Sequence, residues 1–92
     1  EEGRLNMKMA EQITEVEIIV GSLGEIQEDA TVPRNVRTQI QAIISTLKTD
    51  TELSMKVSRA LSELDEIAND VNLQSHTRTQ LYNIMTTLEK LN

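Results

Sequence analysis

The sequence predicts an all-α protein, a four-helix bundle-like domain made of two similar helical hairpins. Three observations support this fold class. The 92 residues include only one Pro and three Gly, and residues that favour helices are abundant. Apolar residues recur at spacings of three and four positions, which is the period of one helix face. The second half of the chain also repeats much of the first half, so two copies of one structural unit are expected.

The whole chain, 1–92, is predicted to form a single domain, with the first hairpin at about 5–48 and the second at about 50–91. A chain of this length buries about 60 to 65% of its unfolded surface, so it needs an efficient core. Apolar residues make up 38% of the sequence, and Tyr82 is the single aromatic residue. The core is therefore expected to be aliphatic, which suits packed helices.

The first helix is predicted by an apolar row that starts near residue 5 and stops before residue 28. Its members are three or four positions apart: Leu5, Met9, Ile13, Val16, Val20 and Leu23. Ile19 and Ile26 widen this row, as expected for a helix that packs against more than one neighbour. Gly21 and Gly24 each cost about 0.8 to 1 kcal/mol relative to Ala. A close helix crossing would explain why they are there.

The second helix is predicted to begin near Pro33, because Pro is tolerated in a first helical turn. Thr31 is its expected N-cap. Its apolar face comprises Val36, Ile40, Ile43, Ile44 and Leu47. Thr49 and Glu52 have the spacing of a capping box, so a third helix is expected to follow at once. Such a tight connection makes the second and third helices antiparallel neighbours.

The third and fourth helices are separated by "NDVN", which breaks the apolar pattern. The third helix is expected to bury Leu53, Val57, Ala60, Leu61, Leu64 and Ile67. The fourth is expected to begin near Leu73 and to bury Leu81, Ile84, Met85, Leu88 and Leu91. The four helices thus form two hairpins.

The internal repeat becomes measurable when the chain is shifted by 41 positions, so that Glu25 falls on Glu66. Residues 25 to 47 then match residues 66 to 88 at nine positions: Glu25, Ile26, Asp29, Arg37, Thr38, Gln39, Ile43, Thr46 and Leu47. Two helices per unit and a period near 40 residues are typical of helical solenoid repeats. The shared Asp, the turn and the following Arg resemble the HEAT type. Two such units predict a compact four-helix domain, because longer arrays are needed for a superhelix.

The segments "EDATVPRNVR" and "LDEIANDVNLQSHTRTQLYNIMTTLEKL" resemble a small archaeal group, the uncharacterised protein family 0147, over about residues 23–91. The most specific piece is "TVPRNVR". The second loop of this family usually has prolines where the present chain has Val71 and Gln74. The resemblance implies an archaeal, cytoplasmic protein of four helices, and it implies no substrate.

Two repeated polar pairs, Asp29 with Arg37 and Asp70 with Arg78, are the candidate site residues. In each pair the two residues lie on either side of a turn. The carboxylate can accept loop N–H groups while the guanidinium of the next helix holds it in a bidentate contact. We interpret the four residues as structural clamps. A ligand site is the alternative, and the duplication of the pair favours the structural role.

No catalytic, cofactor-binding or metal-binding residue is predicted. The chain has no Cys and a single His, His76, so a zinc site of the usual type lacks ligands. "DVNLQSH" begins like a calcium loop, but Ser75 stands where the sharp turn needs Gly and Leu81 stands where a bidentate Glu must be. Ser75 next to His76 does not define a catalytic pair, because triads are defined in space.

The charge balance argues against nucleic acid as a general partner, and the short apolar runs argue against a membrane. The net charge is −6, with a strong acidic excess in residues 1 to 28, so nucleic acid is repelled overall. The longest uninterrupted apolar run, Ile18 to Val20, is far shorter than the roughly 20 residues that cross a bilayer. The acidic first helix is either a solvated face or a surface that docks a basic partner.

The interpretation that the sequence favours is an interaction or structural module that binds another protein or a second copy of itself. Arg34, Met55 and Tyr82 are the candidate protein-contact residues, since Tyr and Arg are enriched at interfaces and Met adapts to irregular surfaces. Two alternatives remain open. One is an RNA- or ribosome-associated accessory protein that uses Arg34, Arg37 and Lys48 as a basic patch. The other is a small enzyme.

Overall fold

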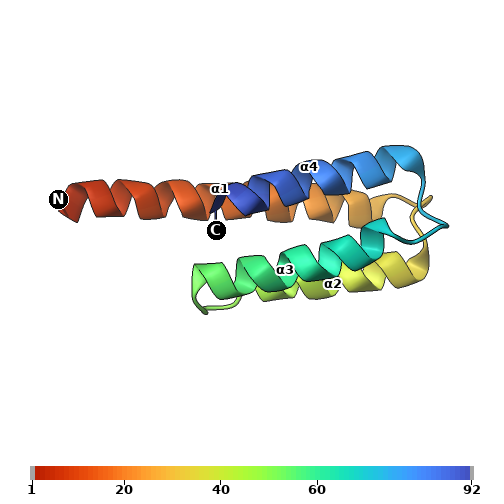
Figure 1. The fold of residues 1–92 in the computed structure, drawn as a ribbon, viewed down its shortest axis with the longest axis horizontal. Coiled ribbons are helices and arrows are strands. Elements are labelled where there is room, and N and C mark those ends of the chain that lie inside the picture. The colour runs from red at the N-terminus through yellow and green to blue at the C-terminus, as the bar shows by residue number, and fades with distance from the viewer. Residues whose placement is uncertain (1, 92) are drawn as a thin grey trace.

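The computed structural model describes residues 2–91, with the surroundings of side chains described for residues 11–91. Four helices follow one another: α1 (Glu2–Glu28), α2 (Arg34–Leu47), α3 (Leu53–Ala68) and α4 (Ser75–Leu91). No strand occurs among the described residues. The predicted all-α fold of four helices is therefore confirmed (Figure 1).

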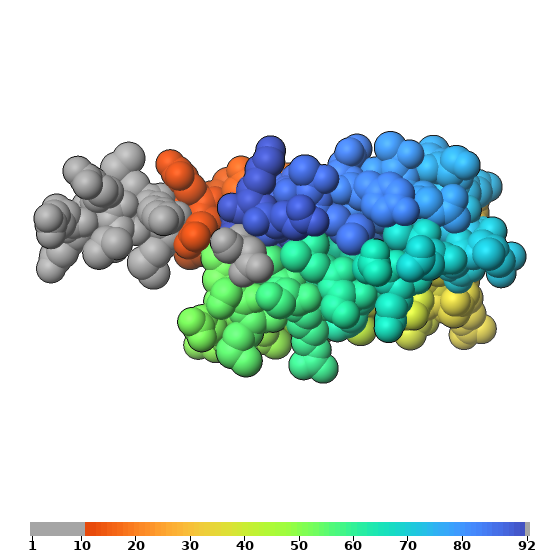
Figure 2. All heavy atoms as spheres, viewed as in Figure 1, coloured from red at the N-terminus to blue at the C-terminus, as the bar shows by residue number. Residues whose placement is uncertain are grey.

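The helices alternate in direction and pack in a closed ring, with α1 on α2, α2 on α3, α3 on α4, and α4 back on α1 (Figure 1). Side chains of α3 and α4 form one continuous surface on the face shown in Figure 2. We call the end with the α1–α2 and α3–α4 connections the loop end. The molecule is elongated, with extents of 48 × 21 × 19 Å.

The elongation comes mainly from α1, which is 27 residues long, whereas the other helices have 14 to 17 residues. At 1.5 Å per residue, α1 measures about 40 Å and α2 about 21 Å. In Figure 1 the N-terminal part of α1 runs past the ends of the other three helices. The bundle therefore covers only the C-terminal part of α1.

The core is aliphatic, as the composition predicts. Its residues come from all four helices and from the two loops at the loop end: Ile19, Leu23, Ile26, Val32, Val36, Ile40, Ile43, Ile44, Leu47, Val57, Ala60, Leu64, Ile67, Leu73, Leu81, Ile84 and Leu88. Val32 and Leu73 are equivalent positions of the two repeats, and each closes the core from its loop. The predicted buried face of α2 is confirmed at every position.

The predicted helix is confirmed for α1, but its apolar row is not buried along its whole length, because Ile13 is 58% exposed. The buried face of α1 is made by Ile19, Leu23 and Ile26, while Val16 and Val20 pack against the core and stay half-buried. The physical reason is the length of α1, because Ile13 lies where the helix leaves the bundle. Leu5 and Met9 lie outside the residues whose side-chain surroundings are described.

Smaller differences affect the other helices. Leu53, Leu61, Met85 and Leu91 pack against the core but remain half-buried. Each lies at an end of its helix or at the border of the buried stripe, where a neighbouring helix covers only one side of it. The apolar row thus predicts the buried direction correctly, and it overestimates the depth of burial at the edges.

The capping predictions were also wrong. Pro33 is the residue before α2 and gives no side-chain cap, whereas the hydroxyl of Thr31 donates to Asp29. α3 begins after Glu52 without a side-chain cap, and the Thr49 hydroxyl donates to the Thr46 carbonyl, 2.6 Å away. Thr31 therefore bonds within its loop, and Thr49 bonds back to the last turn of α2. α4 begins at Ser75, two residues later than predicted.

Gly21 and Gly24 do not mark a close helix crossing. A Cβ atom built on either residue would meet nothing within 4 Å. Their positions in the repeat correspond to Ser62 and Asp65, both exposed on α3. The two glycines thus face open space on the outside of α1.

Candidate functional site

At the loop end, the carboxylate of Asp29 organises the α1–α2 loop. Its Oδ1 accepts hydrogen bonds from the Thr31 amide at 2.9 Å and from the Thr31 hydroxyl at 2.7 Å. These two bonds, the hydroxyl first, hold the pKa of Asp29 below its usual value of 3.8, and His76 acts in the same direction. A small loss of solvation opposes them. Asp29 is therefore a structural carboxylate, bonded within its own loop.

Asp70 has the same role in the α3–α4 loop. Its Oδ1 accepts from the Asn72 amide at 2.8 Å. Its Oδ2 accepts from Nδ2 of Asn35 at 3.3 Å, which joins the second repeat to the start of α2 in the first. In the opposite sense, Oδ2 of Asp29 lies 3.9 Å from Nε2 of His76 at the start of α4. Asn35 and His76 are equivalent positions, so each loop Asp reaches the same position of the other repeat.

The two arginines of the predicted clamps differ in their contacts. Arg78 donates three hydrogen bonds to the loop before it, from Nε to the Ala68 carbonyl at 2.8 Å and from one terminal nitrogen to the carbonyls of Asp70 at 2.9 Å and Leu73 at 3.3 Å. Its partners are thus carbonyl groups and not the predicted carboxylate. A stabilising role for Arg78 remains a prediction, now with a different set of acceptors.

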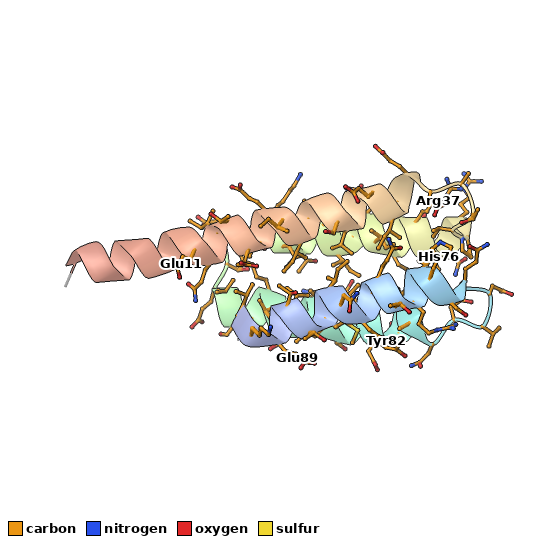
Figure 3. The ribbon with its side chains drawn as sticks, turned by 90° about the horizontal axis from the view of Figure 1, so that it is seen from above. Glu11, Arg37, His76, Tyr82 and Glu89 are labelled. Carbon is orange, nitrogen blue, oxygen red and sulfur yellow. The ribbon has the colours of Figure 1, made fainter. Side chains whose placement is uncertain are left out.

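Arg37 has no such bonds among the described residues. Its Nε is buried and lacks a partner, while its carbonyl accepts from the Gln27 side chain at 3.5 Å. The side chain borders an open hollow of about 380 Å³ lined by Gln27, Arg34, Arg37, Thr38 and Gln41. In Figure 3, Arg37 and His76 lie together at the loop end, and Glu11 and Glu89 lie toward the opposite end. Its role as a clamp also remains a prediction.

The remaining candidate contact residues are not brought together. Arg34 lies at the loop end and borders the hollow of Arg37. Met55, which is 65% exposed, lies in the first turn of α3 at the opposite end, and Tyr82, which is 48% exposed, lies in the middle of α4. Lys48 follows α2, about 20 Å along that helix from Arg34. The basic patch of Arg34, Arg37 and Lys48 is therefore not formed.

A feature that the sequence analysis missed is an apolar groove between α1 and the α2–α3 connection. Its volume is about 480 Å³, and its lining comprises Gln12, Ile13, Val16, Glu17, Val20, Leu47, Lys48, Leu53 and Lys56. We call it the α1 groove. It lies where α1 leaves the bundle. The repeat contained a signal for it, because Ile13 corresponds to the exposed Ser54 and not to a core position of the second hairpin.

The polar groups of the α1 groove stand on opposite walls. Glu17 comes from α1, whereas Lys48 and Lys56 come from the α2–α3 side. Nζ of Lys56 donates to the Thr49 carbonyl at 3.1 Å. The groove therefore combines an apolar lining with one acidic residue and Gln12 from α1 and two basic residues from the α2–α3 side.

The part of the chain whose side chains are described contains no metal-binding cluster. Across residues 11–91, no three His, Asp or Glu side chains lie closely enough together to hold a metal ion. None of the four described helices has the length and apolar content needed to span a bilayer. His76 has a 61% exposed side chain, and its one described acidic neighbour is Asp29.

The fold and these sites define the class of a small all-α, four-helix protein with an exposed apolar groove. The chain belongs to the Uncharacterised protein family (UPF0147), whose model matches residues 4–91. This finding confirms the resemblance seen in the sequence. It assigns no activity.

A solved structure is similar to this chain over most of its length. It is described as the crystal structure of the unknown function protein MMP1188, with 37% sequence identity and a TM-score of 0.80. The match covers 85% of the present chain and 90% of that chain. The comparison with curated proteins gave no match. The four-helix fold is thus shared with this structure, and a function has to be argued from the molecule itself.

Proposed function

We propose that the chain is a protein-binding module and that the α1 groove is its contact face. The observation that supports this most directly is Ile13, which is 58% exposed beside the half-buried Val16, Val20 and Leu53. Single exposed apolar residues are common on proteins, but a contiguous apolar surface in a concave site is typical of an interaction site.

The dimensions and chemistry of the groove fit a helix or an extended segment of a protein. Its volume of about 480 Å³ is comparable with that of small-molecule pockets, roughly 300 to 1,000 Å³, which is room for several side chains of a bound segment. An amphipathic helix bound in such a groove presents apolar residues to the floor and charged residues to the walls. Glu17, Lys48 and Lys56 line the groove and would form ion pairs with those charged residues.

The hollow at the loop end supports a protein contact less well. It is lined by arginine, glutamine and threonine side chains, so the groups that could fix a partner there are polar or charged. Charge attraction is screened by salt when the groups are exposed. The α1 groove offers apolar burial as well as charge.

The test compares Ile13→Asp with Ile18→Asp. The two isoleucines are 58% and 57% exposed on the same helix, but Ile18 does not line the groove. Tagged wild-type protein and both variants are used for affinity capture from a lysate of the source organism. We expect Ile13→Asp to lose the proteins that the wild type and Ile18→Asp retain. Equal retention by both variants would show that the groove is not the contact face.

A further inference from the structure

We infer that the occupant of the α1 groove is a second copy of this chain, whose α1 lies antiparallel to the first in a twofold dimer. The inference rests on the proposed function of the groove and names its partner. The charged residues of the groove are Glu17 on the α1 side and Lys48 and Lys56 on the α2–α3 side. A bound helix must offer an apolar row to Ile13, Val16 and Val20, and acidic side chains to Lys48 and Lys56.

Helix α1 itself meets both requirements. Its apolar row includes Ile13, Val16 and Val20, and Glu17 directly borders that row. Residues 11 to 28 contain five Glu and no Lys or Arg, so this part of α1 is acidic throughout. The chain therefore contains a segment with the chemistry that its own groove selects.

The distribution of charge fits a twofold arrangement. In such an interface, residue i of one copy contacts residue j of the other, and the reverse contact also forms. When the second α1 enters the groove, its Glu17 meets the basic wall of the first copy. The Glu17 of the first copy then meets the basic wall of the second. Both apolar rows are covered in the same step.

The charged groups of the groove are not paired with one another within one copy, although Nζ of Lys56 donates to the Thr49 carbonyl. Among the contacts of residues 11–91, no ion pair joins Glu17 to Lys48 or Lys56, although all three line one groove. Figure 1 shows that the backbone of α1 continues past the ends of the neighbouring helices on this side. The antiparallel α1 of the second copy would lie beside the α1 of the first copy, at the point where the other helices of the first copy end.

The first measurement is the mass of the full-length protein in solution, by sedimentation equilibrium over micromolar to millimolar concentrations. We expect a concentration-dependent increase from the 10.4 kDa of the monomer to twice that mass. Ile13→Asp is expected to remain monomeric, and Ile18→Asp is expected to dimerise like the wild type. A wild-type protein that stays at 10.4 kDa throughout would overturn the inference.

Charge reversal tests the orientation. In a homodimer of Glu17→Lys, the new lysine of each copy faces Lys48 and Lys56 of the other copy. In a homodimer of the double variant Lys48→Glu, Lys56→Glu, Glu17 of each copy faces the two new glutamates of the other. The dissociation constant of each variant homodimer should be more than about tenfold higher than that of the wild-type dimer. Mixed in equal amounts, the two variants place opposite charges together in both halves, and the dimer should return. A mixture that remains monomeric would overturn the proposed arrangement.

The two proposals can fail separately. If the wild type is monomeric but Ile13→Asp still loses a captured partner, then the groove binds another protein and only the dimer is wrong. If the wild type is monomeric and both Asp variants retain the same captured proteins, then both proposals are wrong. Circular dichroism melts of every variant confirm that the compared proteins are folded.

Discussion

Arg37 and Arg78 occupy equivalent positions but have different surroundings, and this difference can be measured. Arg78 satisfies three loop carbonyls, whereas Nε of Arg37 is buried without a partner. Hydrogen bonds that involve a charged group contribute about 1.5 to 3 kcal/mol each, and a buried donor without a partner contributes nothing favourable. The α3–α4 connection therefore depends on its arginine more than the α1–α2 connection does.

We expect Arg78→Ala to lower the free energy of unfolding by about 2 to 3 kcal/mol, and Arg37→Ala to lower it by less than about 1 kcal/mol. For a protein of this size, each kcal/mol corresponds to a change in melting temperature of about 4 to 8 °C. Thermal melts of both variants test the difference. Arg78→Lys serves as a second control, because a lysine lacks the planar fork that reaches three acceptors. Equal losses in the two Ala variants would contradict this assignment.

The carboxyl group of Asp29 makes the free energy of unfolding depend on pH in the acid range. The pKa of its carboxyl group is lowered in the folded state by the two bonds from Thr31. A lowered pKa contributes stability above the unfolded value of 3.8, and this contribution is lost as the pH falls through the folded pKa. Asp29→Ala should therefore be less stable than the wild type at neutral pH, with a difference that shrinks below about pH 4.

Urea unfolding at several pH values between 7 and 2.5 measures this difference. Asp65→Ala is a suitable control, because Asp65 is exposed on α3 and has no counterpart of the Thr31 bonds. A constant difference between Asp29→Ala and the wild type over this range would show that the Thr31 bonds do not stabilise the carboxylate.

Helix α1 contains two glycines, Gly21 and Gly24, that lower its intrinsic tendency to form a helix. Gly21 and Gly24 face open space, so their flexibility is not needed for packing. Gly is less favourable than Ala in a helix interior by about 0.8 to 1 kcal/mol. Each of Gly21→Ala and Gly24→Ala should raise the free energy of unfolding by about that amount.

Equilibrium unfolding in urea measures the effect of each Gly substitution. The matched substitution on α3, Ser62→Ala, is also exposed and should change stability by a smaller amount, since Ser is closer to Ala than Gly is in helix propensity. A loss of stability in either Gly variant would mean that a close packing partner approaches α1 at that residue.

The apolar row of the sequence predicts burial better for α2 than for α1, and the reason is physical. The row of α2 was predicted at every buried position because α2 is short and is covered along its whole length. The row of α1 includes the exposed Ile13, since periodicity gives the direction of an apolar face and not how far along it the neighbouring helices reach. The polar clamps were misjudged in their acceptors, because spacing brings Arg78 to the right loop but does not choose between a carboxylate and a carbonyl.

For the whole molecule, the closed ring of helices makes each hairpin the main cover of the other. The contacts of α2 with α3 and of α1 with α4 join the two hairpins. Leu23, Ile40, Leu64 and Leu81, one from each helix, are all fully buried. A single hairpin would leave one side of these residues in water, so neither hairpin is expected to be stable alone.

Separate peptides of residues 1–48 and 50–91 test this cooperation. Each peptide alone should have low helix content by circular dichroism, and an equimolar mixture should regain the spectrum of the intact chain. The 50–91 peptide with Leu64→Ala and Leu81→Ala is the control, since it should fail to restore the spectrum. A stable helical hairpin from either peptide alone would contradict the expectation.

The reciprocal contacts at the loop end have a consequence for how such a chain could arise. Asp29 reaches His76, and Asp70 reaches Asn35, which are equivalent positions in the two halves. Two identical hairpins facing each other would form the same two contacts. The two halves of the present protein thus have the contact geometry expected of a pair of identical hairpins, with the short connection between α2 and α3 joining them. Because both halves belong to one chain, this pairing is independent of protein concentration.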